Sequence, residues 1–283
     1  MIFEHEIPQG SRLYFGKTAK NKRDLENKVS QIFIADNFEE IVTPNFSFTQ
    51  HQSVNDSKTL INTFDQNNTN LNLRADSTLD VVRIITKRLG RTTSHKKWFY
   101  IQPVFTYPST EHYQMGCEYI DHEDINDIIA LTTKVISTLN IDPVLQISNI
   151  NIPRLICKNL NIDENIFKNG EIAKLYELNI DWLTKLLEVI HLEDLEILLN
   201  NSDIPNDIIE ELNILKTTVK NTSYSNIVVS PLYYALLPYY DGIYYRVIKD
   251  NLTIAKGGSY HSEGIDSLGF ALYTDNLLKV LED

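Results

Sequence analysis

Polar side chains within residues 112–120, HYQMGCEYI, offer the clearest chemistry in the sequence. If this segment is a strand, alternation places Gln114 and Glu118 on one face, with Gly116 between them, and mostly apolar side chains on the other face. The glycine would leave open space, so this wall could bind an ammonium or an imidazole through charge-assisted hydrogen bonds. An ordinary solvated sheet face is the alternative interpretation, and the spacing by itself favours that alternative.

Two further patterns are weaker guides to chemistry. His112, Cys117 and His122 are metal-ligand types, but alternation places Cys117 on the opposite face from His112, so we expect no metal there. The pair Gly257-Gly258 lacks the spacing of a phosphate-binding loop, and paired glycines in a strand favour the close approach of a ligand or another backbone. No Ser-His-Asp or Cys-His signature stands out. The pattern alone therefore predicts a ligand-binding domain without a defined ligand.

The elements that must position the polar wall begin with a helix. Residues 18–36 carry apolar side chains at helical spacing, which predicts an amphipathic helix. Residues 71–78 favour a strand that runs into a helix N-terminus, and that helix should end at Gly90. Residues 98–107 and 112–120 are rich in aromatic and β-branched residues, and a short turn between them predicts a β-hairpin.

The remaining segments complete an α+β order. Residues 50–70 are polar and rich in Asn, and we expect a loop with little regular structure there. Residues 122–140 favour a helix and residues 146–150 a strand. Residues 153–220 have helical spacing and predict a helical insertion, after which strand composition returns before a last helix. The order predicts an α+β fold with a mainly antiparallel sheet flanked by helices.

Composition narrows the functional classes. The chain has 283 residues, of which 42% are hydrophobic, so one large domain with an insertion can bury a sizeable core. A net charge of −12 does not favour general binding to phosphate backbones. The two cysteines, Cys117 and Cys157, form no disulfide framework, which suits a reducing cytosol. Neither a signal peptide nor a membrane span is apparent, so we expect a cytoplasmic protein.

Several segments, in chain order, resemble the catalytic core of class II aminoacyl-tRNA synthetases, specifically the histidyl type. Three segments resemble the class II motifs and three resemble histidine-specific stretches: NFEEIVTPNF, LRADSTLDVVR, WFYIQPVFTYPSTEHYQMGCEYI, YYDG, AKGGSYHSEG and SLGFALYTDNLLKVL. The resemblance spans nearly the whole chain. It implies a synthetase-like core over residues 1–283, with the helical insertion at about 153–220 and no anticodon-binding domain. It also implies a dimer built on residues 37–48 that buries Ile41 and Phe46.

The resemblance implies a largely retained histidine site. The matching positions are Asp76, Thr78, Gln114, Glu118, Tyr240 and Tyr260. Asp76 stands where the family usually has Glu, so its side chain is shorter by one methylene group. Arg74 could orient this acidic group, or it could be a packing or surface residue.

The departures concern ATP. The arginine of the second motif falls at Thr106, that of the third motif at Asn276, and the catalytic arginine near Ala235 or Leu236. Thr and Asn cannot replace the bidentate, charge-assisted contacts of a guanidinium with a triphosphate. The resemblance therefore implies a protein that is not an enzyme, binds no cofactor or metal and does not form an adenylate.

A synthetase-like core without these arginines is similar to the regulatory subunits of short-form ATP phosphoribosyltransferases, the first enzymes of histidine biosynthesis. This likeness implies a homodimer within a hetero-oligomer, which activates the catalytic subunit, takes part in feedback inhibition by L-histidine and contacts neither tRNA nor membrane. Two alternatives remain: an orphan histidyl-tRNA synthetase paralogue with residual amino-acid activation or transfer, and an interaction module without a ligand. The polar wall of Gln114 and Glu118, together with Tyr240, favours a ligand.

Overall fold

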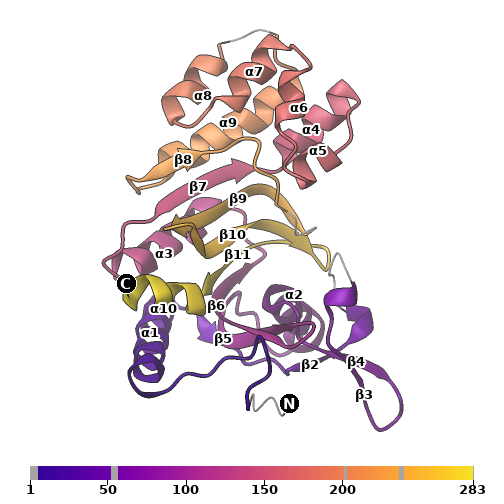
Figure 1. The fold of residues 1–283 in the computed structure, drawn as a ribbon, viewed down its shortest axis with the longest axis vertical. Coiled ribbons are helices and arrows are strands. Elements are labelled where there is room, and N and C mark those ends of the chain that lie inside the picture. The colour runs from indigo at the N-terminus through magenta and orange to yellow at the C-terminus, as the bar shows by residue number, and fades with distance from the viewer. Residues whose placement is uncertain (1–5, 52–56, 201–202, 236–238, 283) are drawn as a thin grey trace, which may run out of the picture. The chain divides into compact units, whose positions relative to one another are not determined.

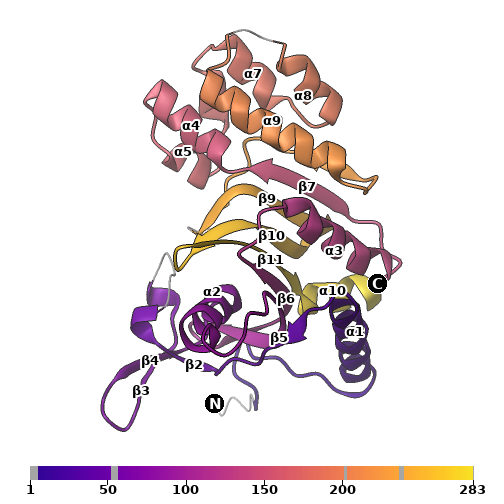
Figure 2. The same ribbon diagram turned by 180° about the vertical axis from the view of Figure 1, so that it is seen from behind.

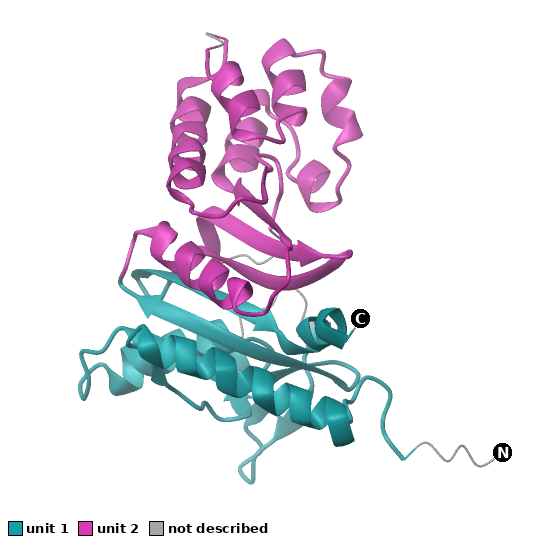
Figure 3. Cartoon of the chain, turned by 90° about the vertical axis from the view of Figure 1, so that its left-hand side faces the viewer, with its two compact units in different colours: residues 1–121, 262–283 teal, residues 122–261 magenta. Residues whose placement is uncertain are grey.

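The chain divides into two compact units (Figure 3). Unit 1 comprises residues 1–121 and 262–283, and unit 2 comprises residues 122–261. The computed structural model describes residues 6–51, 57–200, 203–235 and 239–282. In these residues no helix is long and apolar enough to cross a membrane.

Unit 1 is built on four neighbouring strands. They are ordered β1 (Glu39–Glu40), β5 (Lys97–Thr106), β6 (Thr110–Ile120) and β11 (Ile265–Tyr273). β5 and β6 form the predicted hairpin, and β11 pairs antiparallel with β6, whereas β1 pairs parallel with β5. Antiparallel pairing thus dominates, as predicted.

Helix α1 (Gly16–Ala35) confirms the first predicted helix and covers an aromatic part of the core. The ring of Phe33 lies 5.4 Å from that of Phe99 and 5.8 Å from that of Phe270, measured between centroids. These three rings join the helix to β5 and β11, and aromatic contacts of this kind add to the stabilisation from apolar burial. Asn37, which follows the helix, has a φ of 64°, the left-handed conformation that often ends helices.

A second, small sheet in unit 1 has the order β2 (Phe46–Phe48), β4 (Asn70–Leu73) and β3 (Asn62–Phe64). The expectation of little regular structure over residues 50–70 is therefore wrong for β3; residues 52–56 within this range lie outside the described residues. The short strand β3 is held by backbone pairing with β4 and leaves Asn62 and Phe64 exposed. No alternating apolar pattern marks such a strand in the sequence.

Two helices complete unit 1. Helix α2 (Ser77–Arg83) continues into π-helical turns (Ile84–Leu89) and ends at Gly90, as predicted. Helix α10 (Thr274–Glu282) follows β11 directly, which confirms the predicted strand and last helix.

Unit 2 contains four more strands. Their order is β10 (Leu252–Ser262), β9 (Tyr240–Lys249), β7 (Val144–Asn149) and β8 (Ile227–Val229). β9 pairs antiparallel with β10 and β7, and β8 pairs parallel with β7. Helix α3 (Ile125–Ser137) packs on these strands (Figure 2). The hydroxyl of its Thr132 lies 2.6 Å from that of Tyr245 in β9.

Between β7 and β8 the described chain is helical. The helices are α4 (Asn151–Leu160), α5 (Asn165–Lys168), α6 (Ala173–Tyr176), α7 (Asp181–Leu187), α8 (Leu192–Leu198) and α9 (Asn206–Asn221). Figure 1 shows them gathered beside β7 and β8. Their core contains the fully buried side chains of Leu183, Leu195, Leu212 and Leu215. This helical segment lies where the sequence predicts an insertion.

Candidate functional site

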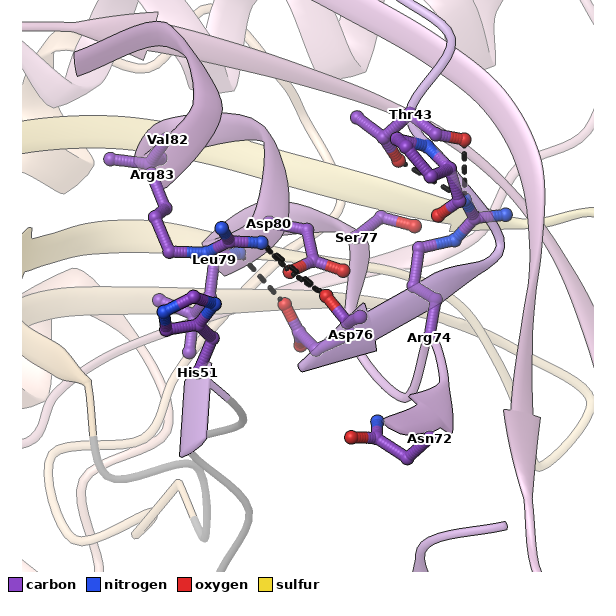
Figure 4. Close-up of polar contacts among 12 residues, drawn as sticks. Thr43, His51, Asn72, Arg74, Asp76, Ser77, Leu79, Asp80, Val82 and Arg83 are labelled. Atoms are coloured by element: carbon purple, nitrogen blue, oxygen red, sulfur yellow. Dashed lines mark hydrogen bonds and ion pairs between the residues drawn. The ribbon is translucent and has the colours of Figure 1, made fainter. Parts of the chain in front are cut away.

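The N-terminus of α2 places the first two predicted site residues. Asp76 has extended backbone angles, and its carboxylate accepts a hydrogen bond from the backbone N–H of Leu79 at 3.0 Å (Figure 4). This is an N-cap, which ties the carboxylate to the helix and places it where the helix dipole favours negative charge. The hydroxyl of Thr78 lies 3.5 Å from the phenol oxygen of Tyr100.

Strand β6 carries the other two predicted residues of unit 1. Gln114 lies opposite Gln102 of β5 and Tyr273 of β11. Glu118 is fully buried and lies beside Gly269 of β11. A Cβ atom on Gly269 would collide with the Glu118 carboxylate, so this glycine provides the space that the carboxylate occupies. The interpretation of this wall as an ordinary solvated face is therefore wrong for Glu118.

Tyr100 is the residue that sequence reasoning missed. It lies directly opposite Gly116, and a Cβ atom on Gly116 would collide with its ring and hydroxyl. The open space expected beside Gly116 is thus wrong, because the Tyr100 phenol fills it. The signal was the hairpin register, since a glycine opposite an aromatic residue on the neighbouring strand invites the ring to cover it.

The electrostatics of this part of unit 1 favour a cationic ligand. Burial, and then the negative charge of Glu118, hold the pKa of Tyr100 well above its usual value, and the charge of Asp76 adds to the rise. Tyr100 therefore stays a protonated phenol near two carboxylates. Carboxylates and hydroxyls gathered in one place can accept hydrogen bonds from an ammonium or an imidazole.

Arg74 packs against the backbone and does not orient Asp76. Its guanidinium is fully buried and lies beside Thr43 (Figure 4). It donates to the carbonyls of Thr43 and Pro44 at 3.0 Å each, and to that of Pro103 at 2.6 and 3.0 Å. It thus joins the turn before α2 to the end of β5 and to the segment before β2. Burial lowers the pKa of Arg74 from its ordinary value.

A second buried network ties α2 to the small sheet. The carboxylate of Asp80 accepts a hydrogen bond from the Arg83 guanidinium at 2.7 Å (Figure 4). It accepts a second one from the hydroxyl of Ser47 at 2.9 Å. Ser47 belongs to β2 and Asp80 to α2. The helix that carries Asp76 and Thr78 is therefore held from two sides, by Arg74 and by Asp80.

The last two predicted residues, Tyr240 and Tyr260, belong to unit 2. They lie opposite each other on β9 and β10, and both are buried. The Tyr240 ring lies 4.8 Å from that of Tyr244, in an edge-to-face arrangement. A Cβ atom on Gly258 would lie 2.6 Å from the carbonyl oxygen of Ile243 and 3.1 Å from the Tyr240 ring. Gly258 thus permits the close approach of a neighbouring strand.

The structure also locates the residues that the resemblance aligns with the synthetase arginines. Thr106 ends β5 opposite Thr110, Asn276 lies in the first turn of α10, and Ala235 is buried. Leu236 lies outside the described residues. Within the described part of the chain, no group of three His, Cys, Asp or Glu side chains is arranged to hold a metal ion.

The chain is similar to known proteins over nearly its whole length. A sequence model of the family Histidyl-tRNA synthetase matches residues 14–277. The ATP phosphoribosyltransferase regulatory subunit of Wolinella succinogenes is 41% identical over 279 residues, which cover 99% of this chain and 96% of that protein. The one of Helicobacter hepaticus is 39% identical over 281 residues, which cover 99% of each chain.

The fold has solved counterparts. The crystal structure of an ATP phosphoribosyltransferase regulatory subunit/histidyl-tRNA synthetase from Bacillus halodurans C matches with a TM-score of 0.85 and 16% identity, and covers 99% of this chain and 84% of that one. This likeness confirms the class II synthetase-like fold. The family model and the 41% and 39% identity to two regulatory subunits over 99% of the chain show the family. The chain belongs to the histidyl-tRNA synthetase-like family of ATP phosphoribosyltransferase regulatory subunits.

Proposed function

We propose that this protein is a non-catalytic, cytoplasmic subunit that assembles with a short-form ATP phosphoribosyltransferase, activates it and senses L-histidine for feedback inhibition. The observation that carries the proposal is the 41% and 39% identity to two regulatory subunits over almost the whole chain. The loss of both ATP arginines, at Thr106 and Asn276, supports a role without adenylation.

The histidine site that we propose is walled by Asp76, Thr78, Gln114, Glu118, Tyr240 and Tyr260. A zwitterionic amino acid needs a carboxylate near its ammonium, and its imidazole needs a hydrogen-bond partner at the far end. We propose that Asp76 and Gln114 bind the ammonium group, and that Glu118 or Tyr260 binds the imidazole. The negative charges of Glu118 and Asp76, which both raise the pKa of Tyr100, support this proposal because carboxylates near a protonated phenol suit an ammonium or an imidazole.

Reconstitution tests the function. Purified protein is added to a short-form catalytic subunit, and ATP- and phosphoribosyl-pyrophosphate-dependent product formation is followed with and without L-histidine. We expect activity only in the mixture, and inhibition by histidine. If histidine acts by favouring one conformation of the complex, the inhibition and the binding must change together. A catalytic subunit that is equally active alone would contradict the proposal.

Glu118→Gln tests the site. This change keeps the volume but removes a negative charge from the proposed site, so histidine affinity by calorimetry should fall by at least about tenfold. Glu111→Gln is the matched control on the same strand, and it should bind like wild type. Histidine inhibition of the reconstituted enzyme should weaken in Glu118→Gln alone. Absence of histidine binding to the wild-type protein, alone and with its partner, would remove the sensing role and leave the fold untouched.

A further inference from the structure

Arg154 of helix α4 forms hydrogen bonds with the first two residues of β9, Tyr240 and Asp241. Arg154 of α4 donates a hydrogen bond through Nη2 to the backbone carbonyl of Tyr240 at 3.2 Å. Its Nη1 lies 3.4 Å from the carboxylate of Asp241 and 3.2 Å from the side-chain oxygen of Asn151. The guanidinium thus spans two consecutive residues of the strand while staying joined to its own helix.

We propose that Arg154 is a positioning residue for the ligand site: it holds the carbonyl of Tyr240 and so sets the place of the Tyr240 phenol. The inference rests on the proposed function, in which Tyr240 contacts histidine. A planar guanidinium suits this role because its fork reaches two acceptors at once, whereas an ammonium acts as a single point.

The phenol follows its backbone because the ring has little freedom. Tyr240 is buried, and its ring contacts Tyr244 at 4.8 Å and Tyr239 at 4.9 Å between centroids. Gly258 lies under its edge, where a Cβ atom would come within 3.1 Å of the ring. A rotated Tyr240 peptide would therefore move the ring against close neighbours, and packed interiors do not absorb such shifts without cost.

The residues after Tyr240 are held independently of Arg154. The N–H of Ile150 donates to the carbonyl of Gly242 at 3.0 Å, and the hydroxyl of Ser259 donates to the carbonyls of Asp241 and Ile243. Loss of the arginine should therefore leave β9 in place beyond Gly242. The expected disturbance is local to the Tyr240 residue and the Asp241 side chain, which separates a positioning role from general unfolding.

The anchor of Arg154 reaches deep into unit 2. Asn149 is fully buried at the end of β7, accepts a hydrogen bond from the N–H of Asn151 at 3.0 Å and donates to the Glu211 carboxylate of α9 at 2.6 Å. Asn151 in turn accepts from Arg154. A chain of polar contacts therefore links α9, β7 and α4 to the carbonyl of Tyr240, and the helical segment supplies a fixed base for the arginine.

The test uses the full-length protein labelled with 3-fluorotyrosine. The Tyr240 resonance is identified by its absence in Tyr240→Phe. Arg154→Ala should shift or broaden this resonance and weaken histidine binding about three- to tenfold, because one charge-assisted contact at a partly exposed site is lost. Arg154→Lys should recover the effect in part only. Asn159→Ala is the matched control, since Asn159 joins the same helix to Asp207 at 3.0 Å and does not touch β9.

Two outcomes separate this inference from the proposed function. If Arg154→Ala folds normally with an unchanged Tyr240 resonance and unchanged histidine affinity, Arg154 does not position Tyr240. If the wild-type protein binds no histidine, the sensing role fails, and the Tyr240 resonance alone decides the positioning role. A double variant adds a readout that general destabilisation would not produce. In a Tyr240→Phe background, Arg154→Ala should cost less affinity than in the wild type.

Discussion

At the scale of single residues, unit 1 depends on buried polar groups that are satisfied by partners far along the chain. Arg74 shows this most clearly, because its buried guanidinium is bonded to carbonyls of Thr43, Pro44 and Pro103 and not to a carboxylate. Removal of such a group leaves buried carbonyls without donors, and each unsatisfied group carries its full desolvation cost. Arg74 is thus one of the two buried groups, with Asp80, that hold the helix carrying Thr78 and its N-cap Asp76.

Arg74→Lys should lower the free energy of unfolding of unit 1 by about 2–4 kcal/mol, because an ammonium cannot satisfy all these acceptors. Trp98 belongs to unit 1 and Trp182 to unit 2, so urea unfolding followed by fluorescence in a Trp182→Phe background reports unit 1. Arg88→Lys, at an exposed position, is the control and should change stability by less than about 0.5 kcal/mol. Equal midpoints for the two variants would show that Arg74 has no such structural role.

At the scale of elements, the small sheet has an apolar face that unit 1 leaves open. Phe46 and Phe48 of β2 are 57% and 46% exposed, and they pair with Leu73 and Leu71 of β4. Ile41 is only 9% exposed and packs largely inside unit 1, so its expected part in a subunit interface stays a prediction with little surface to support it. Phe46 remains a candidate for the dimer that we propose, and Phe48 joins it on the same face.

The double change Phe46→Ser and Phe48→Ser should convert the proposed dimer into monomers. Aromatic side chains buried in an interface contribute much of its binding free energy, and serine cannot replace that contribution. Sedimentation velocity at micromolar concentration measures the mass. Phe64→Ser is a matched control in the same sheet: Phe64 is 65% exposed and pairs with Asn70, so it lies on the opposite face. A wild-type protein that sediments as a monomer would contradict the proposed dimer.

At the scale of the whole molecule, the synthetase-like fold is kept while groups for ATP are replaced. By the resemblance to the synthetase motifs, Thr106 and Asn276 take the places of the arginines that grip the α- and γ-phosphates. Neither side chain carries the charge or the fork of a guanidinium. The site that we propose, with a wall for an amino acid and without guanidinium contacts for a triphosphate, would suit sensing and not activation.

The isolated protein should therefore show no histidine-dependent exchange of pyrophosphate into ATP. An active histidyl-tRNA synthetase, assayed in the same buffer, provides the positive control. Exchange well above background would instead favour an orphan synthetase paralogue with residual activation. The same preparation should still activate the catalytic subunit, which shows that the missing exchange does not reflect unfolded protein.

The sequence by itself determined most of the element order, because apolar periodicity is a local signal. The helix at residues 18–36 and the hairpin of residues 98–107 and 112–120 both appear within a few residues of their predicted limits. Strand β3 was not predicted because it is held by backbone pairing with β4, and its sequence shows no apolar pattern. The resemblance to synthetase motifs identified the family, since motif order survives where single residues change.

Only the tertiary structure decided what the site residues contact. Glu118 is buried because Gly269, on a strand distant in the sequence, leaves room for its carboxylate. Tyr100 fills the space over Gly116, and Arg154 reaches from the helical segment to the carbonyl of Tyr240. Alternation assigns a side chain to a face, but burial and partners depend on which distant strand or helix packs on that face. That choice is made by long-range packing, which no local pattern encodes.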